Sequence, residues 1–578
     1  MTGASPMRAT GRSSGTMGAN RRRIYVTDAG RLVAKTLKTH GVEVVFALCG
    51  DHTNAIFDGC ASEGVRIVDA RDERGAAWMA CGYALSTGHT GVVLVTGGPG
   101  LTNTVTALAD AQLSGVPIVC ITGGVGLAQR GHGHPGDLDQ IAVMRPVSKW
   151  AATVTDGADA GEFLAAAFGH ARAGRPGVAV LEIPVDVSLQ PTEADAGAPL
   201  PAEPVEPDPE RVAVARAAIA AAQRPVVIAG SGAFWSGAGD ALESFVERAR
   251  VPLFTIRGGR GLVADDHELC FGFPNFLAGA AQIAYGEADV VLVIGTKLDL
   301  MLAGGAFNPG ATVVRVDSDP GAFALGRAAD VEIVADAART LEALGAGFGP
   351  LPTQAWLDRL NVARETQRAT LAERAAIAGD PIHPARLVGE LAAALPRDAI
   401  VCVDAGELAL WAVEALPAME PGSQMSSLGS AMGALGMGVP WAVGAKIAHP
   451  DRPVVVLSGD GSFGFGAMEL DTAARHGAPV AVVIGNDGGW GIVRHMQQLV
   501  HGRTVASDLA GTAYEKLADM AGGHGERVTR PADLEVALHN AIASKMPVVV
   551  NVAIDPDPMH DACRMIALMF SRPDATSH

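Results

Sequence analysis

Apolar residues in this chain gather in short continuous runs, and each run is followed by a longer stretch with helical spacing. In the first third of the chain the runs lie at 44–49, 65–70, 91–98, 116–124 and 178–184. Short apolar runs that alternate with helical stretches are typical of a parallel sheet with helices on both faces. The pattern therefore predicts a parallel α/β domain over residues 24–190.

The same alternation appears twice more along the chain. Further strand-like runs occupy 225–230, 251–256, 289–295 and 312–317, and then 399–406, 453–461, 479–487 and 547–554. They predict a central domain over residues 205–350 and a third domain over residues 380–556, with a helical connection near 350–378. The Pro- and acid-rich segment 190–210 is typical of an extended linker. We therefore expect an α/β protein of three doubly wound parallel-sheet domains.

Both ends of the chain lie outside these domains. Residues 1–23 are basic and rich in Ser and Gly, so we expect a disordered segment. A transit peptide and a misassigned start, with Met7 or Met17 as the true first residue, are the alternatives. Residues 557–578 are amphipathic enough to fold back as a lid, although a surface helix would show the same pattern.

Composition narrows the classes of function. The chain has 578 residues, a formal net charge of −18 and a pI near 5.3, which argues against binding to nucleic acid or to an anionic membrane surface. No apolar stretch reaches the roughly 18 residues that a membrane span needs. The seven cysteines are scattered without a C-x-x-C pair, so neither a zinc site nor a disulfide framework is expected. Reduced thiols indicate a cytoplasmic protein.

The most specific chemistry lies in the third block, where two apolar runs end in glycine and acid. The first ends in Gly459-Asp460-Gly461 and the second in Asn486-Asp487-Gly488-Gly489. Neighbouring parallel strands open onto one crevice at their carboxyl ends, where glycine N–H groups and a helix expected to begin near Phe463 can approach a phosphate. Asp460 supplies an oxygen ligand for Mg²⁺. Asp-Gly pairs are often only turns, but two such motifs, each after a buried strand, favour a binding site.

With these motifs the third block resembles the thiamine-diphosphate (ThDP) enzymes. The resemblance implies that Asp460, Asp487 and the Gly489 carbonyl bind Mg²⁺, and that Gly459, Gly461, Ser462, Trp490, Gly491 and Ile492 contact the cofactor. Asp487 stands where the family usually has Asn, which keeps an oxygen donor and adds a negative charge. The segment 427–446 resembles the element that supports the bent cofactor; there Gly433 would offer its carbonyl to the 4′-amino group and Leu435 would be the apolar prop. An ordinary core role is the alternative for Leu435.

The first block carries the second part of the resemblance. Glu73 in RDERGAAWMACGYA (71–84) resembles the glutamate of the acetolactate synthase-like branch, which hydrogen-bonds the aminopyrimidine ring and activates the cofactor. Asp72 and Arg74 replace the usual His and Gln. An acid that merely stabilises the helix N-terminus is the alternative. Gly50, Pro99 and Asn103 match the family's pyrimidine side and are expected to shape the cofactor site.

Three histidines are candidate proton-transfer groups on the substrate side. The segment Gly133-His134-Pro135-Gly136-Asp137 stands where relatives in the family carry a Phe-Gln pair that faces substrate, so the family's usual substrate contacts are not expected here. His52 and His134 are candidate catalytic residues because imidazole titrates near neutral pH, and His132 is a weaker candidate. A solvated loop histidine is the alternative for both residues of this segment.

The resemblance, which covers residues 24–556, implies a ThDP- and Mg²⁺-dependent enzyme that decarboxylates a 2-oxo acid and joins the product to a carbonyl acceptor. A 2-hydroxyacyl-CoA lyase is the alternative; Arg257, Arg260 and Lys297 would then meet CoA phosphates. A catalytically silent ThDP-binding paralogue is the second alternative. The stretch Gly295–Met301 lacks the family's FAD-binding sequence, which argues against FAD. The resemblance also implies a homodimer or homotetramer with active sites between subunits, and a small-molecule 2-oxo acid or 2-hydroxyacyl substrate.

Overall fold

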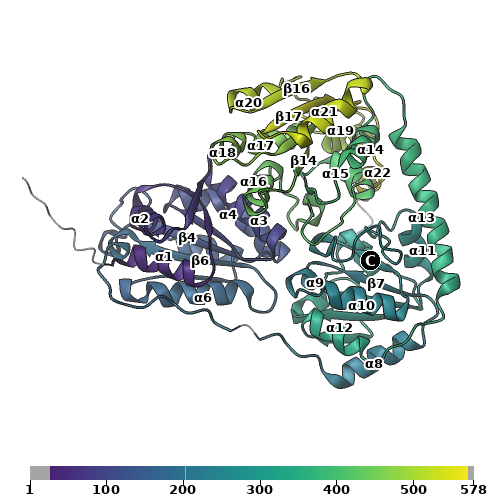
Figure 1. Cartoon of the computed structure of the whole chain (residues 1–578), viewed down its shortest axis with the longest axis horizontal. Coiled ribbons are helices and arrows are strands. Elements are labelled where there is room, and N and C mark those ends of the chain that lie inside the picture. Colours follow the sequence, from purple (N-terminus) through teal and green to yellow (C-terminus); the bar gives the residue numbers. More distant parts are fainter. Residues whose placement is uncertain (1–26, 202, 571–578) are drawn as a thin grey trace, which may run out of the picture.

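The computed structural model describes residues 27–570 except residue 202, so the expectation for residues 1–23 lies outside the described residues. Three parallel sheets of six, five and six strands follow one another along the chain. Figure 1 shows the N-terminal unit in purple and blue, the central unit in teal and the third unit in green and yellow. The prediction of three parallel-sheet α/β units is confirmed.

The N-terminal sheet has the order β2-β1-β3-β4-β6-β5. Its strands are β1 (Val44–Leu48), β2 (Arg66–Asp69), β3 (Gly91–Val95), β4 (Ile118–Gly124), β5 (Trp150–Thr153) and β6 (Val178–Pro184). Its helices are α1 (Ala29–Thr39), α2 (Asn54–Glu63), α3 (Glu73–Thr87), α4 (Pro99–Ser114), α5 (Gln140–Met144), α6 (Ala160–Arg172) and α7 (Val185–Ser188). The order reverses between β1 and β3, and such switch points are where open α/β sheets bind ligands.

The central sheet has the order β11-β10-β9-β7-β8. Its strands are β7 (Pro225–Ala229), β8 (Leu253–Thr255), β9 (Val290–Ile294), β10 (Thr312–Asp317) and β11 (Val331–Val334). Its helices are α8 (Pro209–Ala220), α9 (Ser231–Trp235), α10 (Gly239–Ala249), α11 (Gly279–Glu287) and α12 (Ala337–Gly345). The long helix α13 (Gln354–Ala375) then runs along one side of the molecule toward the third unit (Figure 1).

The third sheet has the order β13-β12-β14-β15-β17-β16, with a switch point between β12 and β14. Its strands are β12 (Ile400–Val403), β13 (Gln424–Ser426), β14 (Val454–Gly459), β15 (Ala481–Asn486), β16 (His524–Val528) and β17 (Val548–Ala553). Its helices are α14 (Pro384–Ala394), α15 (Glu407–Ala415), α16 (Gly438–Ala448), α17 (Asp460–Gly466), α18 (Glu469–Arg475), α19 (Gly491–His501), α20 (Glu515–Met520), α21 (Pro531–Ala543) and α22 (Asp561–Phe570). No helix among the described residues is both long enough and apolar enough to cross a membrane.

Helices α3 and α16 join the N-terminal and third units through one continuous core. The rings of Trp78 and Trp441 meet edge to face at 6.0 Å. Glycines allow the two backbones to approach: a Cβ on Gly82 would lie 2.3 Å from the Trp441 oxygen, and one on Gly444 would lie 2.0 Å from the Met79 oxygen. Because backbone cannot yield as a flexible side chain can, this crossing fixes how the two units sit within one chain.

Candidate active site

A cavity of about 360 Å³ lies at the carboxyl ends of the third sheet, beside the switch point between β12 and β14. The described residues that line it all lie between Pro384 and Ile566. It gathers every residue that the sequence suggested for the diphosphate and metal side: Gly433, Leu435, Gly459, Asp460, Gly461, Ser462, Asp487, Gly489, Trp490, Gly491 and Ile492. Helices α17 and α19 both begin here, so their first N–H groups, which lack intrahelical acceptors, suit a phosphate.

Asp460 is the least compensated group in this cavity. Residue Asp460 is 1% exposed, and neither carboxylate oxygen has a hydrogen-bond partner within 3.5 Å among the described residues. Burial, together with the nearby charge of Asp487, raises the pKa of the Asp460 carboxyl to about 7. Helix α17 begins at Asp460 itself, not near Phe463 as the sequence suggested. A buried carboxylate without donors is costly unless a cation binds it, so the site fits a hard ion such as Mg²⁺.

Asp487 already has a cationic partner. Its Oδ2 accepts from Arg494 Nη2 at 2.7 Å, and its Oδ1 accepts from the Gly489 N–H at 3.1 Å. Burial raises the pKa of the Asp487 carboxyl, and Arg494 opposes that rise. Both carboxylate oxygens keep further lone pairs, so Asp487 can still serve as a metal ligand.

Asp404, which follows β12, organises the cavity and was not identified from sequence. Its buried carboxylate accepts from the N–H groups of Ala405, Gly436 and Gly438 and from the Ser462 hydroxyl. It thereby ties the loop that carries Leu435 to the helix that begins at Asp460. The only signal for Asp404 in the sequence was its position as a charged residue at the end of an apolar strand.

Glu407 and His495 hold the C-terminal segment against the cavity. The Glu407 carboxylate accepts from His495 Nδ1 at 2.6 Å and from the His560 N–H at 2.6 Å, while His495 Nε2 lies 2.9 Å from the Pro556 oxygen. Both ring nitrogens face acceptors, an arrangement that favours the protonated imidazole. The hydrogen bond to Glu407 is the main cause of the raised pKa of His495. Helix α22 packs on α19, and its Ile566 lines the cavity, where the sequence suggested a lid or a surface helix.

The N-terminal candidates form a second cluster. Glu73 is the first residue of α3, and its Oε2 accepts from the exposed Asn103 amide at 2.9 Å. A Cβ on Gly100 would lie 3.4 Å from Glu73 Oε1 and 2.8 Å from the Thr96 side chain, so Gly100 leaves the carboxylate accessible. Pro99 is exposed in the first turn of α4. None of these residues is among those that line the cavity at Asp460.

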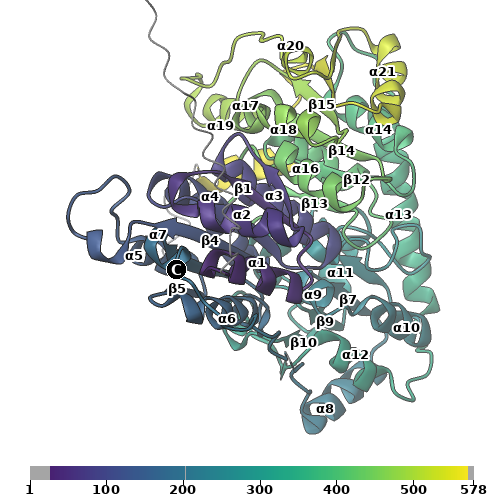
Figure 2. The same cartoon turned by 60° about the vertical axis from the view of Figure 1, so that its left-hand side comes forward.

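His52 belongs to this second cluster, whereas His134 does not. His52 is half-buried, and its Nδ1 lies 3.4 Å from the Thr96 hydroxyl. A Cβ on Gly50 would lie 2.4 Å from Thr96, and one on Gly136 would lie 3.2 Å from the His52 ring. His132 and His134 are exposed in the segment before α5, which Figure 2 shows as a loop that projects from the N-terminal unit.

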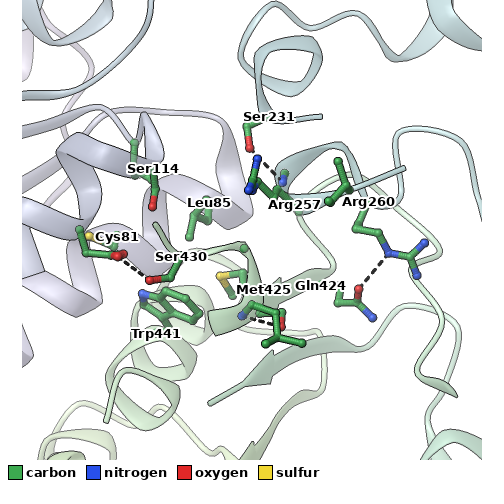
Figure 3. A pocket seen from close by; sticks show the side chains of 18 of the residues that line it. Cys81, Leu85, Ser114, Ser231, Arg257, Arg260, Gln424, Met425, Ser430 and Trp441 are labelled. Atoms are coloured by element: carbon green, nitrogen blue, oxygen red, sulfur yellow. Dashed lines mark hydrogen bonds between the residues drawn. The ribbon is translucent and has the colours of Figure 1, made fainter. Parts of the chain in front are cut away.

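Of the three cationic residues in the central unit that could have bound CoA phosphates, two form ion pairs within the chain. Arg257 is paired with Asp299, and Arg260 is buried and paired with Asp265. Burial lowers the pKa of Lys297. Figure 3 shows Arg257 beside a cavity that the three units share. Its volume is about 60 Å³, well below the roughly 300–1,000 Å³ of sites that hold cofactors.

Three family models of thiamine pyrophosphate enzymes match the chain. They are the N-terminal TPP binding domain at residues 27–143, the central domain at 212–344 and the C-terminal TPP binding domain at 404–552. Thiamine pyrophosphate is another name for ThDP. The matches fall on the three parallel-sheet units described above.

Curated relatives cover almost the whole chain. A probable acetolactate synthase of Mycobacterium bovis is 39% identical over 536 residues, 91% of this chain and 96% of that protein. The large subunit of acetolactate synthase isozyme 2 of Escherichia coli is 32% identical, over 90% of this chain and 95% of that subunit. A probable acetolactate synthase large subunit of Methanocaldococcus jannaschii is 29% identical, over 91% of each chain.

The chain therefore belongs to the thiamine pyrophosphate enzymes and, within them, to the acetolactate synthase-like proteins. It is a ThDP-dependent enzyme of that kind, as the resemblance implied. The comparisons do not favour a 2-hydroxyacyl-CoA lyase or a silent paralogue, because the relatives named above are acetolactate synthases or their large subunits.

Replacing Asp460 by Asn is expected to raise the melting temperature of the cofactor-free protein at pH 8 by about 2–4 °C, because it removes an uncompensated buried charge. D460N should also lose the stabilisation that Mg²⁺ and ThDP give the wild type. Differential scanning fluorimetry measures both effects, with D451N, at an exposed aspartate, as the matched control. If cofactor-free D460N melted below the wild type, the carboxylate would be needed for folding instead of for a ligand.

The raised pKa of His495 makes the attachment of the C-terminal segment sensitive to pH. A base whose pKa is raised by folding stabilises the fold fully below its unfolded value of about 6.5 and ceases to do so as pH rises through the folded value. Hydrogen exchange of residues 556–570 should therefore accelerate above neutral pH, beyond the intrinsic increase, in the wild type. In H495Q the segment should be less protected at pH 6 and should lack this extra pH dependence. The exposed H501Q variant is the control, and an unchanged pH profile in H495Q would refute the assignment.

Proposed function

We propose that this protein uses ThDP and Mg²⁺ to decarboxylate a 2-oxo acid and to join the remaining fragment to a carbonyl acceptor. One C–C bond breaks and another forms, so the reaction combines lyase and transferase chemistry. The observation that carries the proposal is the buried, unpartnered Asp460 carboxylate in a cavity where two helices begin. That combination suits a metal ion bound to a diphosphate.

Within this proposal the third unit holds the anionic end of the cofactor. Asp460, Asp487 and the Gly489 carbonyl bind Mg²⁺, and the first turns of α17 and α19 face the phosphates. Gly433 and Leu435 line the same cavity and support the cofactor rings. Bound there, ThDP would supply a nucleophilic carbon for a carbonyl group and a ring that can take up the electrons released by decarboxylation.

The N-terminal unit supplies the proton chemistry. Glu73 is the catalytic carboxylate: Asn103 fixes its Oε2, so its Oε1 is left to share a proton with a ring nitrogen of the cofactor. His52 is the second catalytic residue, placed by Thr96 at the edge of this cluster, and it moves a proton to or from the substrate. His134 is a less direct candidate because its loop is exposed.

The active site in this proposal needs two copies of the chain. The described residues that line the Asp460 cavity come only from the third unit, while Glu73 and Asn103 lie on the N-terminal unit and Asn103 is exposed. Packing of α3 on α16 fixes these two regions within one chain. A homodimer would bring Glu73 of one copy to the cavity of the other, and two dimers could pair into a homotetramer.

FAD and CoA are not part of the proposed cofactor set. Arg257 and Arg260 are held by carboxylates of the chain, which leaves them unsuited to phosphates. A cytoplasmic location is also proposed, supported by the seven cysteines, all of which are free. The substrate is a small 2-oxo acid, with pyruvate as the first to test.

Replacing Glu73 by Gln separates cofactor binding from catalysis. We expect E73Q to bind ThDP with Mg²⁺ in calorimetry about as tightly as the wild type, because the diphosphate contacts are unchanged. Release of CO₂ from pyruvate should fall by about 10²–10⁴-fold, the range typical of a lost proton-transfer group. E535Q, at an exposed glutamate on α21, is the matched control. Full turnover by E73Q, or a wild type that binds no ThDP, would contradict the proposal.

A further inference from the structure

The proposed metal site contains two carboxylates, of which only one has a cationic partner. Arg494 Nη2 lies 2.7 Å from Asp487 Oδ2, and Arg494 Nη1 donates to the Asp487 carbonyl at 3.3 Å. The two side chains are 14% and 15% exposed, so water screens this pair only weakly. Asp460 has no such partner.

Two glycines make room for this ion pair. A Cβ on Gly489 would lie 2.4 Å from Arg494 Nη1, and a Cβ on Gly491 would lie 2.7 Å from Asp487 Oδ2. Neither glycine has a positive φ, so at these two positions the requirement is for space. The loop between β15 and α19 is therefore shaped around the Asp487–Arg494 pair.

The charges around the Asp487–Arg494 pair show how the pair affects the charge balance of the proposed metal site. His495, the next residue on α19, is paired with Glu407, so each of these carboxylates is matched by one cation of the same helix. With both carboxylates ionised, Asp460, Asp487 and Arg494 together carry a net charge of −1, as one carboxylate and one neutral amide would. A second uncompensated carboxylate would repel the diphosphate that the site is proposed to hold.

We infer that Asp487 and Arg494 act as one unit, in which the arginine cancels the charge of a carboxylate ligand and fixes its orientation. Arg494 is thus a positioning residue for the metal–diphosphate complex. Asp487 offers an oxygen to Mg²⁺ while the site keeps the electrostatic balance of an aspartate paired with an amide. The inference rests on the proposed function, because it concerns the same ThDP and Mg²⁺ site.

The test is a double-mutant cycle on the full-length protein with four variants: wild type, D487N, R494M and D487N/R494M. Isothermal titration calorimetry measures the affinity for ThDP at saturating Mg²⁺. D487N leaves an unpaired arginine beside the metal, and R494M leaves an unpaired carboxylate beside the diphosphate. Each single variant should weaken binding by about 10–100-fold, the usual effect of losing a group that orients a metal ligand.

The double variant should recover to within about threefold of the wild type, because its site again has a net charge of −1. Multiplicative losses in the double variant would overturn the inference, since they would mean that the two residues act independently. R494K keeps the charge and should bind more tightly than R494M, and it also serves if R494M does not fold. Melting temperatures of the cofactor-free variants check the fold.

The two proposals fail in different ways. A wild type that binds no ThDP in the presence of Mg²⁺ would reject the proposed function itself. A wild type that binds ThDP, together with a double variant that shows no recovery, would reject only the joint action of Asp487 and Arg494.

Discussion

The proposed cofactor site depends on one unsatisfied group, the buried carboxylate of Asp460. Proteins rarely bury a carboxylate without donors, because the lost hydration is not replaced. Here the two oxygens are buried with no hydrogen-bond partner among the described residues, while Asp404, one strand away, accepts five hydrogen bonds. The contrast between these two acids supports a structural role for Asp404 and the proposed ligand-binding role for Asp460.

The fold accounts for where these acids meet. Strands β12, β14 and β15 are neighbours in a parallel sheet, so the residues that follow them emerge at one edge. The proposed charge balance is then set by α19, which places Arg494 against Asp487 and His495 against Glu407. Because His495 also contacts the Pro556 oxygen, the C-terminal segment is attached to the same helix that begins at the cavity.

Most strands of the fold could be predicted from the sequence, and the strands that could not share one physical reason. Central strands were identified because burial on both faces makes them continuously apolar. The strands that were not anticipated, β5, β11, β13 and β16, all lie at sheet edges, where less burial leaves a weaker pattern; β11 alternates between buried and exposed positions.

The residues of the candidate site were likewise only partly predictable from the sequence. Asp460 could be selected as a candidate ligand from the sequence because its motif, Gly-Asp-Gly directly after an apolar strand, is contiguous along the chain. Arg494 and the Glu407–His495 pair were missed because their roles depend on partners that only the folded chain brings together, such as Glu407 and His495, which lie 88 residues apart. Asp404 was also missed, although its strand was identified. The exposure of His134 likewise depends on the course of a loop, which local sequence does not determine.

The central claim, that each active site combines Glu73 of one chain with Asp460 of another, is tested most directly by mixing two inactive variants. In a mixed dimer of E73Q and D460N chains, one site carries both substitutions and the other carries none. Random pairing after co-refolding or co-expression should therefore restore about a quarter of the wild-type activity. If both residues served a site within one chain, every site in the mixture would carry a substitution, and the mixture would remain as inactive as the separate variants.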